Sequence, residues 1–278
     1  MWNFRAAAVQ LTSTEDVADN LAAVRSAVTN CAAAGATLVV LPECFAFLGA
    51  SEQAKLAITE DLNAPGPILN TLRELATKHA VTIVGGGMAE RNPSDSLRPY
   101  NTSVVVTADG LHATYRKIHL FDVDIPGGAQ LCESAATTPG TSLSLYQAQG
   151  CTIGQSICYD LRFPELFRSL TQDGAELITV PAAFTAHTGQ AHWHVLLRAR
   201  AIENQVWIVA AAQVGVHNPK RKTYGHSTII DPWGNVVAEC TADEPGFAVA
   251  ELSHRALAER RAQMPCLQHA VLLRDRRP

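Results

Sequence analysis

The chain has 278 residues, of which 47% are apolar and 17% charged, and its formal charge is −4. This length and composition are those of a globular protein with one large core or two moderate ones. No basic stripe interleaved with aromatic residues is present, which argues against a nucleic-acid partner. The apolar runs, such as 206–212, are far shorter than the roughly 20 residues that a membrane helix needs, so we expect no membrane span.

The cysteines and the first residues bear on the cellular setting. The seven cysteines are odd in number and include no C-x-x-C pair, which argues against a disulfide framework and a structural zinc. Segment 1–10 lacks the basic stretch and long apolar run of a secretory signal. These features favour a reduced, cytoplasmic setting.

The spacing of apolar residues in the first half predicts alternating strands and helices. Ser13 and Asp16 are typical of a helix cap. Two apolar runs, 101–107 and 111–115, flank the turn sequence 108–110, which predicts an antiparallel hairpin and hence a mixed sheet. Before this hairpin the expected order is a strand at 4–10, a helix from Val17 to a stop at Gly35, a strand at 37–41, a helix from Ile68 and a strand at 81–84.

The second half repeats the pattern of the first. Three similarities occur in the same order, which favours two βα halves that each cover one sheet face with helices. The expected fold is therefore α/β, with two packed sheets and outer helices. No Ser-, Gly- or Pro-rich linker separates the halves, so residues 1–278 are expected to form a single domain. The similar pairs are 35–45 with 174–184, 81–87 with 206–212, and 103–110 with 227–234.

Cys158 follows the apolar run 152–157 and precedes Phe163-Pro-Glu165, a sequence that opens a helix. A residue at such a strand-to-helix turn lies at the edge of the sheet, where substrates of α/β proteins bind. There the backbone N–H of Tyr159 could face a developing oxyanion. Cys158 is therefore a candidate nucleophile, although most cysteines are small buried apolar residues.

Two further reactive side chains follow strands. Glu43 comes directly after the apolar run 38–42, where the similar position of the second half is Ala182, and it could act as a general base. The alternative is a solvated loop acid. Lys117 could favour a thiolate and hold an oxyanion, or it could be an ordinary surface charge. Glu133 could orient Lys117 through a charge-assisted hydrogen bond, although most glutamates are exposed.

The conjunction of these motifs resembles the nitrilase, or carbon–nitrogen hydrolase, superfamily. That resemblance implies an αββα sandwich, usually dimerised through helices near the nucleophile. It also implies that Glu43 is the base, Lys117 the oxyanion stabiliser, Cys158 the nucleophile and Glu133 an accessory acid. The motifs are Leu-Pro-Glu43-Cys-Phe, Tyr-Arg-Lys117-Ile-His, Cys158-Tyr-Asp-Leu-Arg-Phe-Pro-Glu165, His192-Trp193, the segment 196–203, Gly225-His-Ser227 and Asp231-Pro-Trp-Gly234.

Within the superfamily the chain is most similar to deaminated glutathione amidases. This implies release of an α-keto acid and cysteinylglycine, with substrate contacts from Arg162 and Thr185. A guanidinium fork suits a carboxylate, but Arg162 could instead form an ion pair at the helix start with Glu165. The segments that carry this similarity are 122–128, Cys132-Glu-Ser134, Pro139-Gly140, 210–215, Lys220-Arg221, Met264-Pro265 and Gln268-His269.

The sequence also allows other interpretations of its function. An ω-amidase or another small-amide hydrolase, acting on a substrate such as α-ketoglutaramate, is the rival enzyme, and a catalytically quiet scaffold that binds a protein is the alternative outside enzymes.

His192 and His194 suggest a metal site, but a spacing of two points helix side chains to different faces, so no metal is expected. Gly85-Gly-Gly87 matches no phosphate-binding pattern and predicts crowded backbone at a strand end, so we expect no cofactor. His194 stands where relatives commonly carry Glu, and the redox sensitivity of Cys44 is left open.

Overall fold

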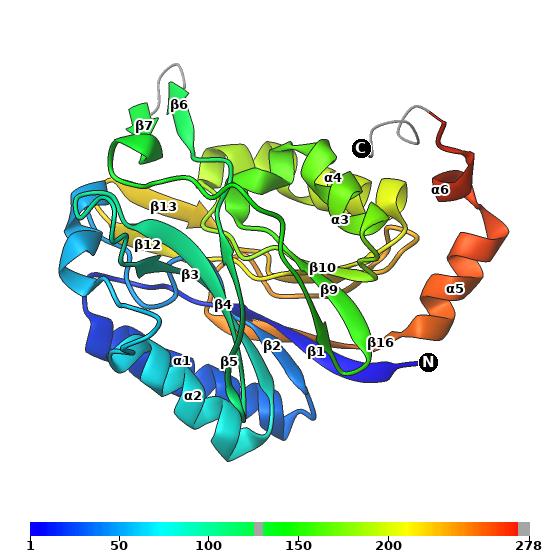
Figure 1. Cartoon of the computed structure of the whole chain (residues 1–278), viewed down its shortest axis with the longest axis horizontal. Coiled ribbons are helices and arrows are strands. Elements are labelled where there is room, and N and C mark those ends of the chain that lie inside the picture. Colours follow the sequence, from blue (N-terminus) through cyan, green and yellow to red (C-terminus); the bar gives the residue numbers. More distant parts are fainter. Residues whose placement is uncertain (125–129, 272–278) are drawn as a thin grey trace.

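The computed structural model describes residues 1–124 and 130–271, and two six-stranded sheets lie between layers of helices in it (Figure 1). The expected αββα arrangement of two mixed sheets is confirmed. Segment 125–128, part of the similarity found in 122–128, lies outside the described residues.

Each large sheet contains both parallel and antiparallel pairs. In the first, β1 runs parallel to β2 and β2 to β3, whereas β16, β4 and β5 are antiparallel to their neighbours. Its strands, in spatial order, are β16 (Gly246–Ser253), β1 (Asn3–Gln10), β2 (Leu38–Val40), β3 (Thr82–Glu90), β4 (Tyr100–Thr107) and β5 (Gly110–Arg116). The antiparallel pairing of β4 and β5 is the expected hairpin.

The second sheet has the same order of strand directions. Strands β9, β10 and β11 are parallel, and β8, β14 and β15 are antiparallel to their neighbours. In spatial order they are β15 (Val236–Glu239), β14 (Thr228–Ile230), β11 (Trp207–Ala210), β10 (Leu177–Thr179), β9 (Cys151–Gln155) and β8 (Leu145–Ala148). Two small hairpins pair β12 (Val214–Asn218) with β13 (Arg221–Tyr224), and β6 (Asp122–Asp124) with β7 (Gln130–Cys132).

Helices α1 and α2 cover the outer face of the first sheet and α3 and α4 that of the second, whereas α5 and α6 lie at the edge of the molecule (Figure 1). Asp16, rather than Ser13, caps the first helix by accepting from the backbone N–H of Asp19, whereas the Ser13 hydroxyl donates to the Phe45 carbonyl. This corrects the expected cap. The α-helices are α1 (Val17–Ala33), α2 (Pro67–His79), α3 (Pro164–Gln172), α4 (Ala186–Asn204), α5 (His254–Gln263) and α6 (Cys266–His269), and the 3₁₀ helices are η1 (Glu52–Ile58), η2 (Glu133–Ala135) and η3 (Cys158–Arg162).

Three apolar clusters hold the layers together, and alternation along the strands explains them. In β1, Ala7 and Val9 face α1 and α2, whereas Ala6 and Ala8 face the other sheet. Successive side chains of a strand point to opposite faces, so one short strand contributes to two clusters. The third cluster lies between the second sheet and the helices α3 and α4, where Trp193 and Phe167 are buried.

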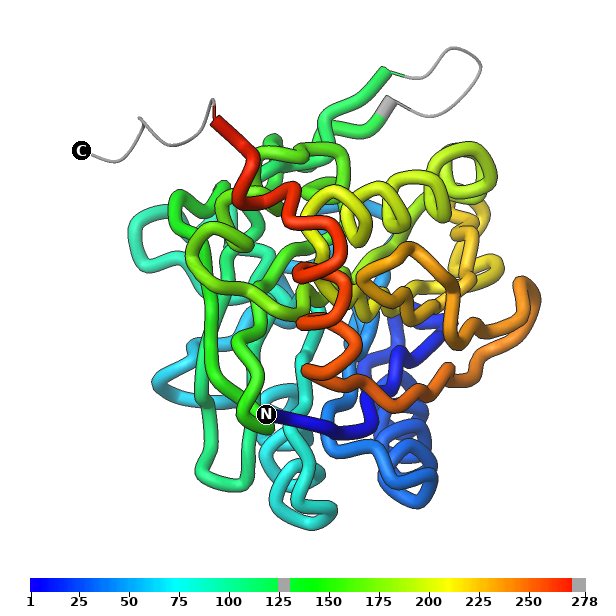
Figure 2. The backbone as a smooth tube through the Cα atoms, turned by 90° about the vertical axis from the view of Figure 1, so that its right-hand side faces the viewer, coloured from blue at the N-terminus to red at the C-terminus, as the bar shows by residue number. Residues whose placement is uncertain are grey.

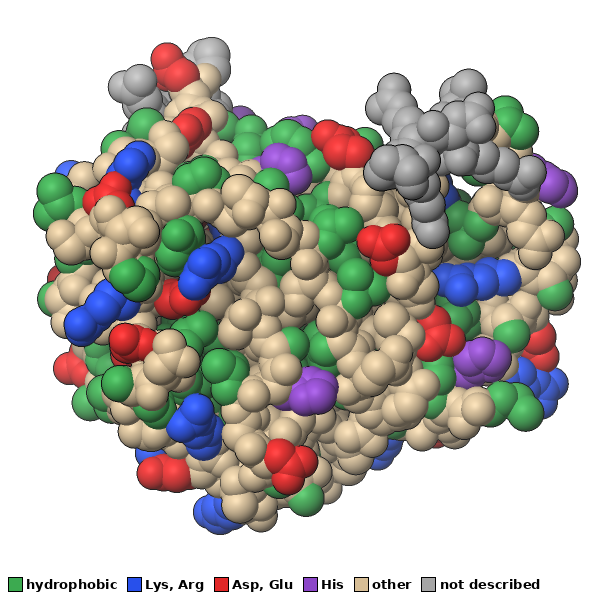
Figure 3. All heavy atoms as spheres, viewed as in Figure 1, with side chains coloured by type: hydrophobic (Ala, Val, Ile, Leu, Met, Phe, Trp, Pro, Cys, Tyr) green, Lys and Arg blue, Asp and Glu red, His purple; other side chains and the backbone are tan. Residues whose placement is uncertain are grey.

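The first and last strands lie side by side although they are far apart in the sequence, as Figure 2 shows for β1 and β16. On the face seen in Figure 3, acidic and basic side chains are interspersed among apolar ones without a continuous region of one sign. Among the described residues, the helices are too short or too polar to cross a membrane.

Glycine is required where the two sheets approach each other at their strand ends. A Cβ on Gly86 would lie 2.1 Å from the Leu41 carbonyl oxygen and 2.2 Å from the Pro181 side chain. A Cβ on Gly87, whose φ is +136°, would lie 2.7 Å from Asn101 Oδ1. The expected crowding is confirmed, but these glycines lie inside β3, which continues to Glu90, and not at a strand end. Residues that follow β2 and β10 and one at the start of β4 meet there.

Candidate active site

The strand ends carry the side chains that the sequence singled out. Glu43 follows β2, Lys117 follows β5, Glu133 opens η2 and Cys158 opens η3 after β9. All four are buried, with exposed fractions of 8% or less, and all four line one pocket. Residues separated by more than 100 positions therefore share one cavity at the junction of the two sheets.

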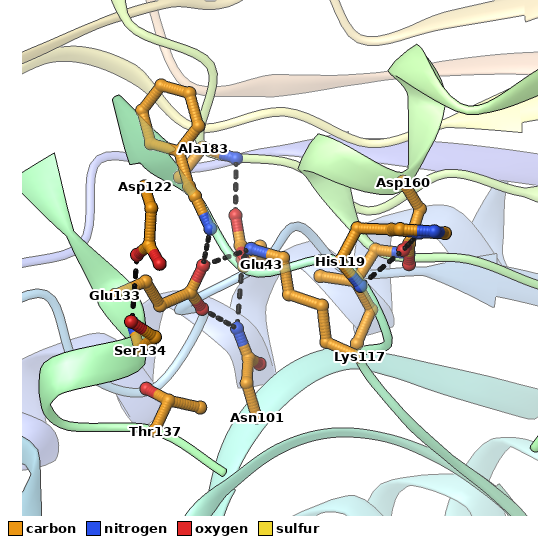
Figure 4. Close-up of polar contacts among 12 residues, drawn as sticks. Glu43, Asn101, Lys117, His119, Asp122, Glu133, Ser134, Thr137, Asp160 and Ala183 are labelled. Carbon is orange, nitrogen blue, oxygen red and sulfur yellow. Dashed lines mark hydrogen bonds and ion pairs between the residues drawn. The ribbon is translucent and has the colours of Figure 1, made fainter. Parts of the chain in front are cut away.

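Lys117 lies between two carboxylates (Figure 4). Its Nζ donates to Glu43 Oε1 at 2.9 Å and to Glu133 Oε2 at 2.8 Å. The expected contact between Glu133 and Lys117 is thus present. With two bonds fixed, the direction of the ammonium is set by the protein rather than by solvent.

Two further groups orient the carboxylates. Asn101, on β4, donates through Nδ2 to Glu43 Oε1 at 2.9 Å and to Glu133 Oε1 at 3.2 Å. The backbone N–H of Ala183 donates to Glu43 Oε2 at 3.0 Å (Figure 4). Sequence reasoning missed Asn101, because a single polar residue at the start of an apolar strand carries no local signal of its partners.

Cys158 is held in an uncommon backbone conformation. Its φ is +48°, which non-glycine residues rarely adopt and which tends to occur at functional sites. Its N–H donates to the Pro181 carbonyl at 2.8 Å, so the turn is tied to the end of the strand β10. The conformation turns the thiol into the pocket that Glu43 and Lys117 also line.

Burial and neighbouring charges shift the pKa values of the groups in this cluster in different directions. Burial opposes the charge of Lys117, but Glu133 and Glu43 outweigh it and hold the pKa of Lys117 well above its usual value. Burial also opposes the charge of Glu133, yet Lys117 lowers the pKa of Glu133. Burial and then the Glu43 charge raise the pKa of Cys158 well above its usual value, against the smaller effects of Lys117 and the Ala183 N–H. Lys117 thus favours the thiolate, as expected, but burial and Glu43 outweigh it, so the thiol of the resting protein keeps its proton.

We expect this raised pKa to be visible in a thiol titration. Because the thiol of Cys158 holds its proton above the ordinary value of 9.0, its thiolate should not form between pH 6 and 9 and should appear only in more alkaline solution. The measurement is the ultraviolet thiolate absorbance of the protein minus that of its Cys158→Ala variant. A titration step below pH 8 would contradict the expectation.

Asp160 stabilises the turn that carries Cys158. Its buried carboxylate accepts from the Tyr115 hydroxyl at 2.8 Å and the Ile157 N–H at 2.8 Å, and it contacts His119 Nδ1 at 2.7 Å. The His119 ring stacks on Phe163, with centroids 3.6 Å apart. Asp160 therefore links the segment after β5 to the turn that carries Cys158 (Figure 4).

Removing this carboxylate should destabilise the fold. In Asp160→Ala the buried Tyr115 hydroxyl and Ile157 N–H lose their acceptor, and we expect the free energy of unfolding to fall by about 3 kcal/mol. Urea denaturation measures the change. Asp243→Ala, at an exposed position, is the control and should stay within about 0.5 kcal/mol of the parent protein. Equal stabilities of the two variants would remove Asp160 from this supporting role.

The other predicted site residues also line the pocket. Tyr159 contacts the rings of Phe121 and Phe163, at centroid distances of 4.9 and 5.3 Å. Thr185 caps α4, where its Oγ1 accepts from the Thr188 N–H. The guanidinium of Arg162 does not pair with Glu165 in the described part of the chain. Its Nη1 lies 3.2 Å from His192 Nδ1, and it packs over the Phe184 ring at 5.2 Å.

Cys44, next to Glu43, also lines the pocket. Burial, followed by the charge of Glu43, raises the pKa of Cys44 to about 12. A thiol that keeps its proton is a poor nucleophile toward oxidants. The Cys44 thiol therefore keeps its proton at neutral pH.

His194 contacts groups outside the pocket. Its Nε2 lies 2.8 Å from Glu239 Oε1, and His226 Nδ1 lies 2.6 Å from the same oxygen. Within residues 1–124 and 130–271, these three side chains are the group that could hold a metal ion, with donor atoms within 4.8 Å of one another. The structure thus pairs His194 with a residue of another element rather than with His192, which contacts Arg162.

Fold and site together define a two-sheet α/β sandwich with a cysteine, two carboxylates and an ammonium in one pocket. The family model for carbon-nitrogen hydrolases matches residues 5–262. A deaminated glutathione amidase of Synechocystis sp. is 42% identical over 273 residues, which is 97% of this chain and 99% of that protein. The chain therefore belongs to the carbon–nitrogen hydrolase family.

Two solved structures extend the comparison. The NitFhit protein of Caenorhabditis elegans matches with a TM-score of 0.90 and 39% identity. The match covers 97% of this chain but only 65% of the NitFhit chain. A Glu-to-Gln variant of the amidase from Nesterenkonia sp. AN1, with acrylamide added to its active-site cysteine, matches with a TM-score of 0.76 and 26% identity, over 95% of this chain and 98% of that chain.

Proposed function

We propose that this carbon–nitrogen hydrolase is an amidase that cleaves a small amide through a thioester on Cys158. Glu43 takes the thiol proton as Sγ attacks the carbonyl carbon, and Lys117 Nζ with the Tyr159 N–H holds the oxyanion. Glu43 then gives the proton to the leaving nitrogen, and the C–N bond breaks. In the second stage Glu43 takes a proton from water, which attacks the thioester, and the proton returns to sulfur as the C–S bond breaks.

The observation that carries this proposal is the bonding of Lys117 to Glu43 and Glu133 beside a protonated thiol. A neutral thiol next to an ionised carboxylate needs a proton transfer before attack, and the transfer leaves the total charge of the pocket unchanged. Glu133 keeps its charge and holds Lys117, so it acts as a positioning residue. The active-site cysteine and the glutamate varied in the Nesterenkonia amidase give independent support.

For the substrate we propose deaminated glutathione, which would be cleaved to an α-keto acid and cysteinylglycine. Relatives of this name from Synechocystis sp. and human are 42% and 43% identical to the chain. The Arg162 guanidinium and the Thr185 hydroxyl line the pocket and suit the α-keto acid carboxylate. The rival is α-ketoglutaramate, which has the same acyl half but ammonia as its leaving group.

Parallel kinetics with the two amides test the substrate. Deaminated glutathione should give the higher kcat/KM, by about 10-fold or more, because its dipeptide half adds contacts that ammonia cannot make. Release of cysteinylglycine is followed by labelling of the amino group that cleavage frees, and that of ammonia by a coupled assay. A higher kcat/KM for α-ketoglutaramate would favour the ω-amidase, and activity on neither amide would refute the proposal.

We further propose that the protein is a homodimer or higher homo-oligomer of the cytoplasm. Helix α4 exposes Val195 and Ile202, with exposed fractions of 68% and 48%, and these side chains could be covered by a second copy. All seven cysteines are free, as expected in a reducing compartment. Light scattering of the purified protein would test the oligomer, and a monomer mass would exclude it.

A further inference from the structure

The pocket holds more positive charge than the proposed chemistry uses. Apart from Glu43, Lys117 and Glu133, the charged side chains that line it in the described part of the chain are Lys55, Arg162, Arg221 and Glu52. With Lys117, Glu43 and Glu133 included, four cations and three anions leave the pocket with one positive charge in excess. Lys55, Arg162 and Arg221 are the cations that the proposed mechanism does not use, so more than one of them is available to bind a carboxylate.

Arg221 is the cation whose bonding is least complete. It opens β13, its side chain is 21% exposed, and its Nε is buried without a hydrogen-bond partner in the described part of the chain. Its Nη1 lies 3.5 Å from Glu52 Oε1, which is long for a hydrogen bond to a carboxylate. Buried polar groups of native proteins are nearly always bonded, so a guanidinium in this state is suited to a ligand.

Arg221 and Arg162 belong to different elements of the pocket wall. Arg162 belongs to η3, the turn that Cys158 opens. The groups whose charge acts most strongly on Arg221 are Cys44 and Glu52, followed by Glu43 and Cys158. Because Glu43 protonates the leaving nitrogen in the proposed mechanism, the leaving group must face Glu43, which is one of the groups whose charge acts on Arg221.

We propose that Arg221 binds a free carboxylate at the far end of the leaving group. The preferred substrate is then an amide whose amine half is a short peptide with a free carboxyl terminus. The planar fork of the guanidinium can bind both carboxylate oxygens, and Glu52, 3.5 Å from its Nη1, also pairs with Lys55 at 3.0 Å. This inference rests on the proposed amidase function and adds the recognition of the amine half.

The test compares two substrates on one enzyme preparation: deaminated glutathione and the same compound with its terminal carboxylate converted to a carboxamide. The parent protein should prefer the free acid in kcat/KM by about 10- to 100-fold, mainly through KM, as expected for a charged hydrogen-bonded pair. Arg221→Met should reduce this preference to less than about 3-fold, and Arg221→Lys should leave an intermediate value. Because the preference is a ratio, a partly unfolded preparation does not change it.

Lys222→Met is the matched control. Lys222 is the exposed neighbour of Arg221 on the same strand and does not line the pocket, so its loss removes the same charge from the same hairpin. This variant should keep the full preference for the free acid. If Arg221→Met keeps it too, or loses both substrates in equal proportion, the inference is overturned while the amidase function stands. If the parent protein cleaves neither compound, the proposed function itself fails.

Discussion

Replacing Cys158 with alanine is expected to lower kcat/KM by roughly 10⁵-fold or more, because the sulfur that forms the thioester is gone. The fold should persist. Only one buried atom is lost, and alanine carries the same penalty as cysteine at the positive φ of this position, so the free energy of unfolding should change by less than about 1 kcal/mol. Steady-state kinetics and urea denaturation of the same sample measure both effects.

The second pocket thiol provides the control for this prediction. Cys44 lines the same cavity and its pKa is raised as well, but of the two thiols only that of Cys158 is also affected by a hydrogen bond with Glu43, the proposed base. Incubation with a slowly hydrolysed amide should therefore give an acyl adduct on the parent protein and on Cys44→Ala, and no adduct on Cys158→Ala. An adduct on Cys158→Ala, or turnover close to the parent rate, would transfer the nucleophile role to another residue. A catalytically quiet scaffold would form no adduct in any of the three proteins.

Local sequence patterns were sufficient for the layers of the fold. The positions of β1, α1, β2, α2 and β3 follow from apolar periodicity and from Pro, Gly and Asp at the ends of segments. The similarity between the halves also pointed to two sheets. What local patterns cannot contain is the pairing of β1 with β16, whose register joins Asn3 to Ser253 across almost the whole chain.

The candidate site, too, could be predicted from local sequence only in part. Glu43, Lys117 and Cys158 could be singled out because reactive side chains at strand ends are conspicuous in sequence. The residues that position them could not be singled out in this way. Asn101 and Asp160 act through contacts with residues 58 and 45 positions away, so their roles depend on the meeting of the sheets. The protonation state of the Cys158 thiol could not be predicted either, because burial and Glu43 outweigh the effect of Lys117 on its pKa only once the pocket has formed.

Replacing Glu43 with glutamine is expected to lower kcat by about 10³- to 10⁴-fold, since both stages of the proposed mechanism need its carboxylate as proton acceptor or donor. The same change should make the thiol of Cys158 more acidic. Burial remains, but the negative charge that raises the pKa of Cys158 is removed while the Lys117 ammonium stays. The variant should thus form a thiolate at lower pH than the parent protein, although it turns over far more slowly.

These opposite changes separate a base from a residue that only maintains the pocket. Glu133→Gln is the matched comparison, because Glu133 also bonds Lys117, at 2.8 Å, but has no proton to transfer in the proposed mechanism. Its kcat should fall by only about 10- to 100-fold, since the amide oxygen of glutamine can still accept from the ammonium. Thiolate absorbance and single-turnover kinetics of both variants measure the two effects. Glu43→Gln turnover at the parent rate, or an unchanged thiol titration, would show that proton transfer and thiol acidity are governed by a group other than Glu43.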